Sequence, residues 1–402
     1  MKPIYLDHAA TTYPYPFSSS IPYANPSSPH ILGQSARTII ENSRDLVTFF
    51  TSHSYTTHTT IFTSSGTEAN NLILKQSWDH IITSPLEHPS VLAYLRTVQQ
   101  HPTSCLQQAV RTLPLSPKPP TVHILPLTPE GTVSLSRLSS LLSFLHTSIH
   151  PNPHTPGRQG SRILVTIQAV NNEVGIIQPL QDISAITHQY PDTIFHTDAV
   201  QFANLISLSP ADAVTLSAHK LHGPKGIGSL TIPKSLLSSL QPLIHGGGQE
   251  FALRSSTEAT PLIAHFAKAT ITQDAHQLSY SNHYSHLHSL LSHYPQHASS
   301  APRAPHIINI ATPHAEEIAT QLSLHNICVS THSACSTTPS NSGELSVSHV
   351  IQALSEAYTV HYHKPYPLPL SGIRVSFAPS TTVKEVKKFI KVFDKISSQF
   401  QT

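Results

Sequence analysis

The chain carries little charge for its length of 402 residues. Lys and Arg number 23 and Asp and Glu 21, so only 11% of the residues are charged, where about 25% is usual. The net charge of +2 argues against disorder driven by charge repulsion and against a basic nucleic-acid-binding surface. The one dense basic run, Lys384–Lys391, is typical of the solvated face of a helix.

Long apolar runs and cysteines are also scarce. No stretch approaches the roughly 18 apolar residues of a membrane span, and no apolar signal region opens the chain. We therefore expect a cytoplasmic protein with no membrane or nucleic-acid partner. The three cysteines, Cys105, Cys328 and Cys335, form no C-x-x-C pair, so we expect neither a disulfide framework nor a metal site. Cys328 precedes Val329 in a strand-like segment, where a buried thiol is expected.

Glycine is the third scarce residue, with 14 in the chain where about 28 would be ordinary. Such a chain should keep glycine mainly where the backbone requires it. The densest group lies in Ser217–Gly228, directly after an apolar strand-like run. A lysine in that setting, Lys220, is a candidate nucleophile, because partial desolvation favours the neutral amine. From these residues alone, an ordinary surface lysine remains an alternative.

The chain does contain a regular alternation of strand-like and helical patterns. Strands are predicted at 61–63, 80–83, 162–167, 193–198, 213–217 and 228–232, the last pairing with the one before it. Helices are predicted at 67–75, 91–100 and 183–190. The alternation predicts an α/β fold with a mostly parallel sheet covered by helices, whose ligands bind at the carboxyl ends of the strands.

The remaining patterns divide the chain. A long helical stretch at 264–297 indicates the boundary to a smaller domain, which contains a strand at 373–377 and ends in a helix at 383–400. Segments 113–120, 150–161 and 361–371 are rich in Pro with Ser or Gly, and we expect them to be surface insertions.

Two features support a cofactor site around Lys220. Asp198 ends the strand before the one that Lys220 follows, so both side chains should reach one pocket if these strands are neighbours. A pyridinium cofactor needs such a pair, an amine for its aldehyde and a carboxylate for its ring nitrogen. The strand-to-helix turn Ser64–Asn70 can hold a phosphate on its free backbone N–H groups.

A series of short motifs, in their order along the chain, resembles that of the pyridoxal-phosphate-dependent cysteine desulfurases, in the class V aminotransferase family. The resemblance covers about 370 residues. The matching segments are Tyr5–Thr12, Ser65–Asn70, Leu86–Val91, Val170–Gly175, His196–Gln201, Ser217–Gly228, His245–Glu250, Arg254–Thr257, Ser333–Cys335 and Ile373–Phe377.

The resemblance implies a fold and a domain division. It implies the α/β fold of the fold type I pyridoxal phosphate transferases, with a mostly parallel seven-stranded sheet in the large domain and a smaller α+β domain. The large domain would span residues 16–264. The small domain would combine 1–15 with 265–402 and carry a mobile cysteine loop at about 331–343.

The resemblance also implies a role for each matching residue. Lys220 would bind the cofactor aldehyde, Asp198 the ring nitrogen and Gln201 the phenolic oxygen. His88 would stack on the ring and move protons. Asn172 would contact the ring and substrate, and Arg374 the substrate carboxylate. The phosphate would be held by Gly66, Thr67, Ser217 and His219, and by Thr257 from the partner subunit of a homodimer.

Cys335 is the residue that distinguishes this activity from others in the family. It would take sulfur from L-cysteine as a persulfide, release L-alanine and pass the sulfur to an acceptor protein, an iron–sulfur scaffold or a thiolation protein. The alternatives are a class V aminotransferase, a selenocysteine lyase or a non-catalytic relative. One departure is Ser256, since the family usually has glycine in the corresponding Arg-Ser-Gly-Thr motif.

Overall fold

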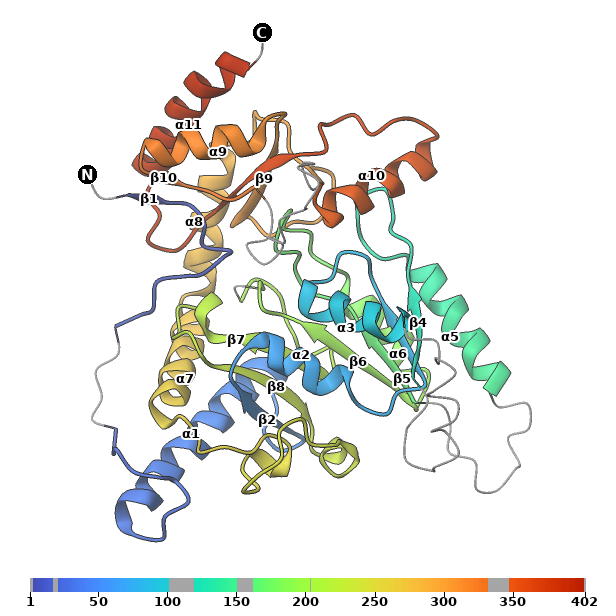
Figure 1. Cartoon of the computed structure of the whole chain (residues 1–402), viewed down its shortest axis with the longest axis vertical. Coiled ribbons are helices and arrows are strands. Elements are labelled where there is room, and N and C mark those ends of the chain that lie inside the picture. The colour runs from blue at the N-terminus through green and yellow to red at the C-terminus, as the bar shows by residue number, and fades with distance from the viewer. Residues whose placement is uncertain are drawn as a thin grey trace.

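A seven-stranded sheet forms the centre of the larger part of the molecule (Figure 1). The computed structural model describes residues 3–16, 21–100, 119–149, 162–202, 204–331 and 347–400. The order of the strands is β2-β8-β7-β6-β5-β3-β4. β8 pairs antiparallel with both β2 and β7, whereas the other pairs are parallel.

The predicted α/β fold, the mostly parallel seven-stranded sheet and the pairing of 228–232 with 213–217 are confirmed. The strands are β2 (His58–Thr63), β3 (His80–Thr83), β4 (Thr121–Ile124), β5 (Ile163–Thr166), β6 (Thr193–Asp198), β7 (Ala213–Ser217) and β8 (Gly228–Pro233).

Helices cover both faces of this sheet because alternate strand side chains enter two different hydrophobic clusters. In β5, Ile163 and Val165 join one cluster and Leu164 joins the other. The first cluster receives side chains from α1, α5, α6 and α7, and the second from α2 and α3. A sheet buried on both faces explains the continuous apolar runs in the sequence. The helices are α1 (Ile31–Ser52), α2 (Gly66–Leu74), α3 (Pro89–Gln100), α5 (Leu135–Ile149), α6 (Leu180–Thr187) and α7 (Thr260–Ala275).

A smaller assembly lies above the large sheet in Figure 1 and has its own hydrophobic cluster. It contains one parallel two-stranded sheet, β1 with β10, and one antiparallel sheet, β9 with β11. The strands are β1 (Ile4–Tyr5), β9 (Ile307–Ala311), β10 (Ile327–Cys328) and β11 (Gly372–Ser376). The helices are α8 (Gln277–Ser289), α9 (Ala315–Leu324), α10 (His349–Tyr362) and α11 (Val383–Ser397).

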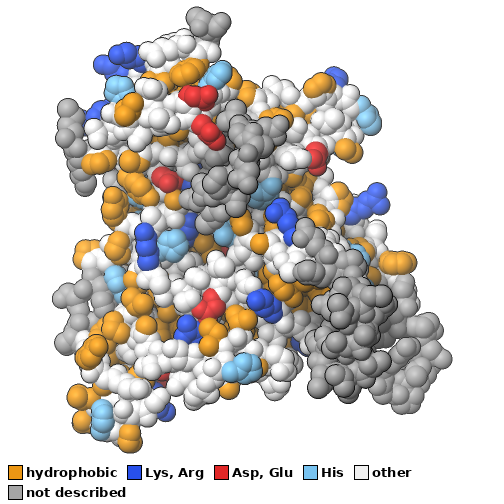
Figure 2. Space-filling view, in the orientation of Figure 1, with side chains coloured by type: hydrophobic (Ala, Val, Ile, Leu, Met, Phe, Trp, Pro, Cys, Tyr) orange, Lys and Arg blue, Asp and Glu red, His pale blue; other side chains and the backbone are white. Residues whose placement is uncertain are grey.

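The surface reflects the composition of the chain. Figure 2 shows Lys, Arg, Asp and Glu side chains scattered thinly over a face that is mostly uncharged. Lys384 and Lys391 lie on the exposed side of α11, as the sequence predicts. In the described part of the chain, no helix combines the length and apolar character needed to cross a bilayer.

Cys328 corrects one expectation. Its thiol is free and only partly buried, although the sequence predicts a buried position. The reason is that β10 is only two residues long and pairs with β1 alone. Cys105 and Cys335 lie outside the described residues, as do 150–161 and most of 113–120.

Candidate active site

A cavity of about 160 Å³ lies at the carboxyl ends of the central strands, at the edge where the sequence predicts a ligand. Asp198 is the last residue of β6 and Ser217 the last of β7, and both line the cavity. These two strands are parallel neighbours, as the argument from Asp198 and Lys220 required. Ten predicted site residues line this cavity: Gly66, Thr67, His88, Asn172, Asp198, Gln201, Ser217, His219, Lys220 and Arg374.

Lys220 is held at the cavity by the turn that follows β7. It ends a short 3-10 turn, Ala218–Lys220, and its ammonium group donates a hydrogen bond to the carbonyl oxygen of Ala9. Gln201 donates to the same oxygen through Nε2, at 2.7 Å. The turn requires Gly223, because a Cβ there would lie 2.8 Å from Ala218 Cβ. The N-terminal segment and the central sheet therefore meet at Lys220.

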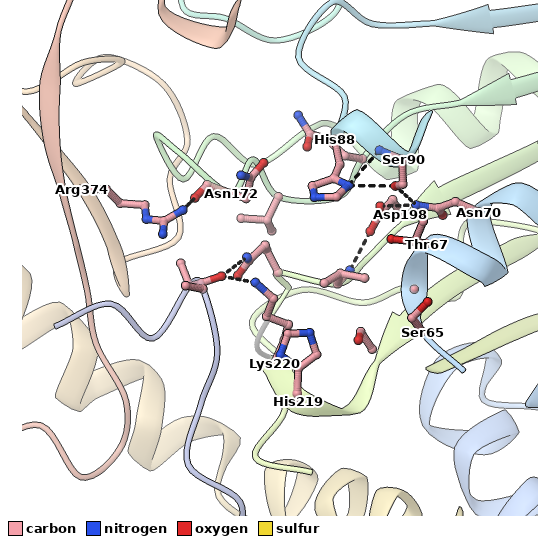
Figure 3. A pocket seen from close by; sticks show the side chains of 18 residues that line it. Ser65, Thr67, Asn70, His88, Ser90, Asn172, Asp198, His219, Lys220 and Arg374 are labelled. Carbon is pink, nitrogen blue, oxygen red and sulfur yellow. Dashed lines mark hydrogen bonds between the residues drawn. The ribbon is translucent and has the colours of Figure 1, made fainter. Parts of the chain in front are cut away.

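Asp198 belongs to a chain of hydrogen bonds that ends at His88 (Figure 3). Asn70 Nδ2 donates to Asp198 Oδ2 at 2.7 Å and to Ser90 Oγ at 2.9 Å. Ser90 Oγ lies 2.8 Å from His88 Nδ1. The other carboxylate oxygen, Oδ1, accepts the backbone N–H of Val200. These donors fix the orientation of a buried carboxylate.

The ring of His88 is held in one tautomer when neutral. The backbone N–H of Ser90 donates to His88 Nδ1 at 3.1 Å, so Nδ1 is the acceptor and the proton lies on Nε2. Burial lowers the pKa of His88, and the nearby Lys220 lowers it further, while Asp198 partly opposes both effects. A neutral imidazole at physiological pH is suited to stacking on an aromatic ring.

The start of α2 forms a cradle for an anion. Ser65 caps the helix by accepting the backbone N–H of Glu68 at 3.2 Å. This cap does not use the N–H groups of Gly66 and Thr67, which can therefore bind an anion. A Cβ on Gly66 would lie 3.0 Å from Val200 Cγ2, so the cradle is closely packed. Hydroxyl groups of Ser65, Thr67 and Ser217 surround it.

His219 contributes a neutral ring to the same cavity. Burial, with Lys220 and Lys225 nearby, lowers the pKa of His219 to about 4. Its Nδ1 lies 3.1 Å from Thr11 Oγ1. An uncharged imidazole can donate one hydrogen bond to a phosphate oxygen.

Arg374 reaches the cavity from β11 of the smaller assembly. Figure 3 shows it at the opposite end from Ser65 and Thr67. The side chain is 2% exposed and forms an ion pair of 2.6 Å with Asp7. Its Nη1 group donates to the carbonyl oxygen of Asn172, whereas Nε has no hydrogen-bond partner. A buried guanidinium with an unused N–H can bind a carboxylate.

A buried glutamate fastens the loop that carries His88. Glu87 accepts hydrogen bonds from Ser84 Oγ at 2.6 Å and from the backbone N–H of Gln168 at 3.0 Å. Burial raises the pKa of Glu87 to about 8; the hydrogen bonds from Ser84 and Gln168 lower this pKa, and the nearby Asp198 raises it. This contact joins the loop after β3 to the loop after β5, so His88 and Gln168 face one cavity.

These groups fit pyridoxal phosphate. Its aldehyde needs an amine, its pyridinium nitrogen a carboxylate and its phosphate a cradle of N–H and hydroxyl groups. Lys220, Asp198 and the turn at Gly66 supply one of each around a single cavity. Asn70 Oδ1, also at this cavity, is buried with no partner and is free to accept a further hydrogen bond. The fold and site define a pyridoxal-phosphate-dependent enzyme of fold type I.

The chain belongs to the class V aminotransferase family, whose model matches residues 4–112 and 118–389. A NifS/IcsS protein homolog from Lactobacillus delbrueckii subsp. bulgaricus is 32% identical over 99% of this chain and 98% of its own length. Cysteine desulfurase IscS of Dictyoglomus turgidum is 30% identical over 100% of this chain and 96% of its own length. The mitochondrial cysteine desulfurase of Saccharomyces cerevisiae is 30% identical over 98% of this chain and 75% of its own length.

Solved structures show the same fold. The NifS-like protein from Rickettsia africae ESF-5 superposes with a TM-score of 0.77, at 28% identity, over 98% of this chain and 99% of that chain. A structure described as SspA in complex with cysteine has a TM-score of 0.66 at 26% identity, over 94% of this chain and 100% of the other.

Among the described residues, one predicted site residue does not line the main cavity. Thr257 lines a separate cavity with Ser64 and Arg254, and its predicted partner phosphate belongs to a second subunit. Cys335 lies outside the described residues.

The sequence reasoning also missed residues that the cavity uses, above all Asn70 and Ser90. The signal for Asn70 was present, because it lies four residues after Gly66 on the same face of α2.

Proposed function

We propose that this chain is a cysteine desulfurase, which converts L-cysteine to L-alanine and transfers the sulfur to an enzyme cysteine. The observation that carries the proposal is the single cavity that holds Lys220 and Asp198 together with Arg374. Relatives named cysteine desulfurase match nearly the whole chain at 30% identity, and the SspA relative was solved with cysteine.

Pyridoxal phosphate is the cofactor in this proposal. When bound, it supplies an electron sink that stabilises negative charge at the substrate α-carbon. Lys220 would bind its aldehyde, Asp198 its ring nitrogen and Gln201 its phenolic oxygen. His88 and Asn172 would contact the ring, and Gly66, Thr67, Ser217 and His219 the phosphate. Asn70 keeps the Asp198 carboxylate oriented by its hydrogen bond of 2.7 Å.

The residues of the chain then divide the work on the substrate. Arg374 binds the carboxylate of L-cysteine and so orients the α-carbon toward Lys220. Lys220 takes the α-proton. The thiolate of Cys335 attacks the substrate sulfur, the bond between this sulfur and Cβ breaks, and a persulfide remains on Cys335. Protonation of the remaining carbon skeleton yields L-alanine.

The setting of the enzyme is part of the proposal. The sulfur acceptor is an iron–sulfur scaffold or a thiolation protein, and the protein is cytoplasmic. The enzyme is a homodimer in which Thr257 reaches the phosphate in the partner subunit. The chain divides into a large domain, 16–264, and a small one, 1–15 with 265–402. The separate hydrophobic cluster around β9 and β11 supports this division.

The test is incubation of the purified protein with pyridoxal phosphate and L-cysteine, with alanine and sulfide measured separately. We expect equal amounts of both when a thiol reductant releases the sulfur. Cys335→Ser should abolish both products, whereas Cys328→Ser, which changes the partly exposed free thiol, should leave them unchanged. Full activity of C335S on cysteine would contradict the proposed role of Cys335.

A further inference from the structure

Segment 246–257, which precedes α7, has an unusual backbone. Glu250, Phe251 and Ala252 have φ values of 49°, 59° and 62°, and Ser256 has a φ of 142°. Residues other than glycine rarely adopt these backbone conformations, and each such conformation costs free energy. The segment must therefore be held in place by contacts with the rest of the fold.

One such contact joins the segment to the start of α2. Arg254 Nε forms an ion pair with Glu68 Oε1 at 2.8 Å, and the two side chains are only 20% and 11% exposed. Because water and dissolved ions have little access to this pair, salt screens the attraction between its charges only weakly.

Glu68 also holds the cradle at the start of α2. Its second oxygen, Oε2, accepts the backbone N–H of Ser64 at 2.8 Å and the hydroxyl group of Ser64. Burial alone would raise the pKa of Glu68, but the hydrogen bonds from Arg254 and Ser64 lower it below its usual value. The carboxylate therefore stays charged and holds Ser64 in place from outside the main cavity, which neither residue lines.

Glu68 links the turn at the main cavity to the segment that lines the second cavity. Residues Ser65–Thr67 offer N–H and hydroxyl groups to the main cavity, while Thr257, three residues after Arg254, lines a second cavity with Ser64. We propose that Glu68 is a positioning residue for the cofactor phosphate, which locks this turn to the strained segment through Arg254. This inference rests on the proposed function, because the phosphate belongs to pyridoxal phosphate.

The test compares two probes that differ only in the phosphate. Equilibrium binding of pyridoxal phosphate and of pyridoxal is measured by absorbance for the wild-type protein and for Glu68→Gln and Arg254→Met. Loss of a charged hydrogen bond should weaken binding of pyridoxal phosphate about tenfold in each variant, while binding of pyridoxal stays unchanged. Because the two side chains act as a pair, the double variant should lose no more than either single variant.

Glu385→Gln is the matched control. Glu385 is also the third residue of its helix and binds the backbone N–H of Thr382, but it lies on α11, outside the cavity. The Glu385→Gln substitution should lower the stability of its helix to a similar extent and leave binding of both probes unchanged.

Three outcomes separate the two proposals. If E68Q binds pyridoxal phosphate like the wild type, or if both probes weaken by the same factor, the inference about Glu68 is wrong and the proposed function stands. If the wild-type protein fails to bind pyridoxal phosphate at all, the proposed function itself is wrong.

Discussion

Ser256 occupies a backbone position that suits glycine. Its φ of 142° lies in the region that L side chains rarely adopt, and the family motif has glycine at this place. Ser256→Gly should relieve the strain and, after the entropy cost of a new glycine, raise the free energy of unfolding by about 1 kcal/mol. Urea denaturation measures the change.

The control for this substitution is Ser207→Gly, at an exposed serine outside the positive-φ set. There a glycine adds freedom to the unfolded chain and removes an exposed hydrogen bond between the hydroxyl groups of Ser207 and Ser209, so the free energy of unfolding should fall by about 1 kcal/mol. A loss of stability in both variants would show that the conformation of Ser256 carries no strain.

Asn70 is the residue that orients Asp198, and the neighbouring Asn71 provides a comparison. Asn70→Ala removes the donor to Asp198 Oδ2 and to Ser90 Oγ, whereas Asn71 Nδ2 bonds only the carbonyl oxygen of Thr67. N70A should lower kcat on cysteine about tenfold or more, since a hydrogen bond to a charged group is lost. N71A should change kcat by less than about twofold. Equal rates in the two variants would contradict the role of Asn70.

At the scale of elements, the buried ion pair between Arg44 and Glu250 joins α1 to segment 246–257. The pair spans 2.7 Å, and its side chains are 7% and 2% exposed. Glu250 also accepts the backbone N–H of Phe62 in β2. Glu250→Gln leaves a buried guanidinium without its main partner, so we expect a loss of about 3 kcal/mol in the free energy of unfolding.

Glu41 offers the matched control, because it binds the same arginine from the surface at 56% exposure. Glu41→Gln should cost less than about 1 kcal/mol. Thermal or urea unfolding of both variants shows whether the loss of stability depends on burial of the carboxylate or only on its charge. Equal losses would overturn our account of Glu250.

The sequence predicted elements best where the pattern was local. Segment 80–83 is β3 and 193–198 is β6, because short β-branched runs between turn residues indicate strands directly. β2 begins three residues earlier than predicted, at His58. Its polar residue Thr60 is buried because its hydroxyl bonds those of Thr48 and Thr231. Those partners lie on α1 and β8, so hydropathy along the chain gave no signal for them.

At the scale of the whole molecule, buried histidines should control stability in acid. Burial lowers the pKa of His8 and His306 to about 4 and that of His196 to about 3. The unfolded chain binds protons at these histidines near pH 6.5, about 2.5 units above the folded pKa of His8 and His306 and about 3.5 units above that of His196. Their contribution is therefore complete above pH 6.5 and is lost as the pH falls toward 4.

Glu87 acts in the opposite direction, because its folded pKa of about 8 exceeds its unfolded value. Three histidines outweigh one carboxyl, so the urea midpoint should fall steadily between pH 6.5 and 4.5. Each proton changes the free energy of unfolding by about 1.4 kcal/mol per pH unit. His8→Phe should make the dependence less steep, whereas substitution of the exposed His293 should not. A midpoint constant over this range would contradict the prediction.

The sequence by itself determined the chemical groups and their order along the chain. Lys220, Asp198 and the turn at Gly66 follow strand-like runs, and parallel strands bring their carboxyl ends to one edge. Only the tertiary structure decided which groups contact each other. Arg374 lies 202 residues from Asn172 and 367 from Asp7, yet bonds both. Asn70 bonds Asp198 across 128 residues. Such contacts depend on how helices pack on a sheet, and the spacing of residues along one strand or helix carries no record of that packing.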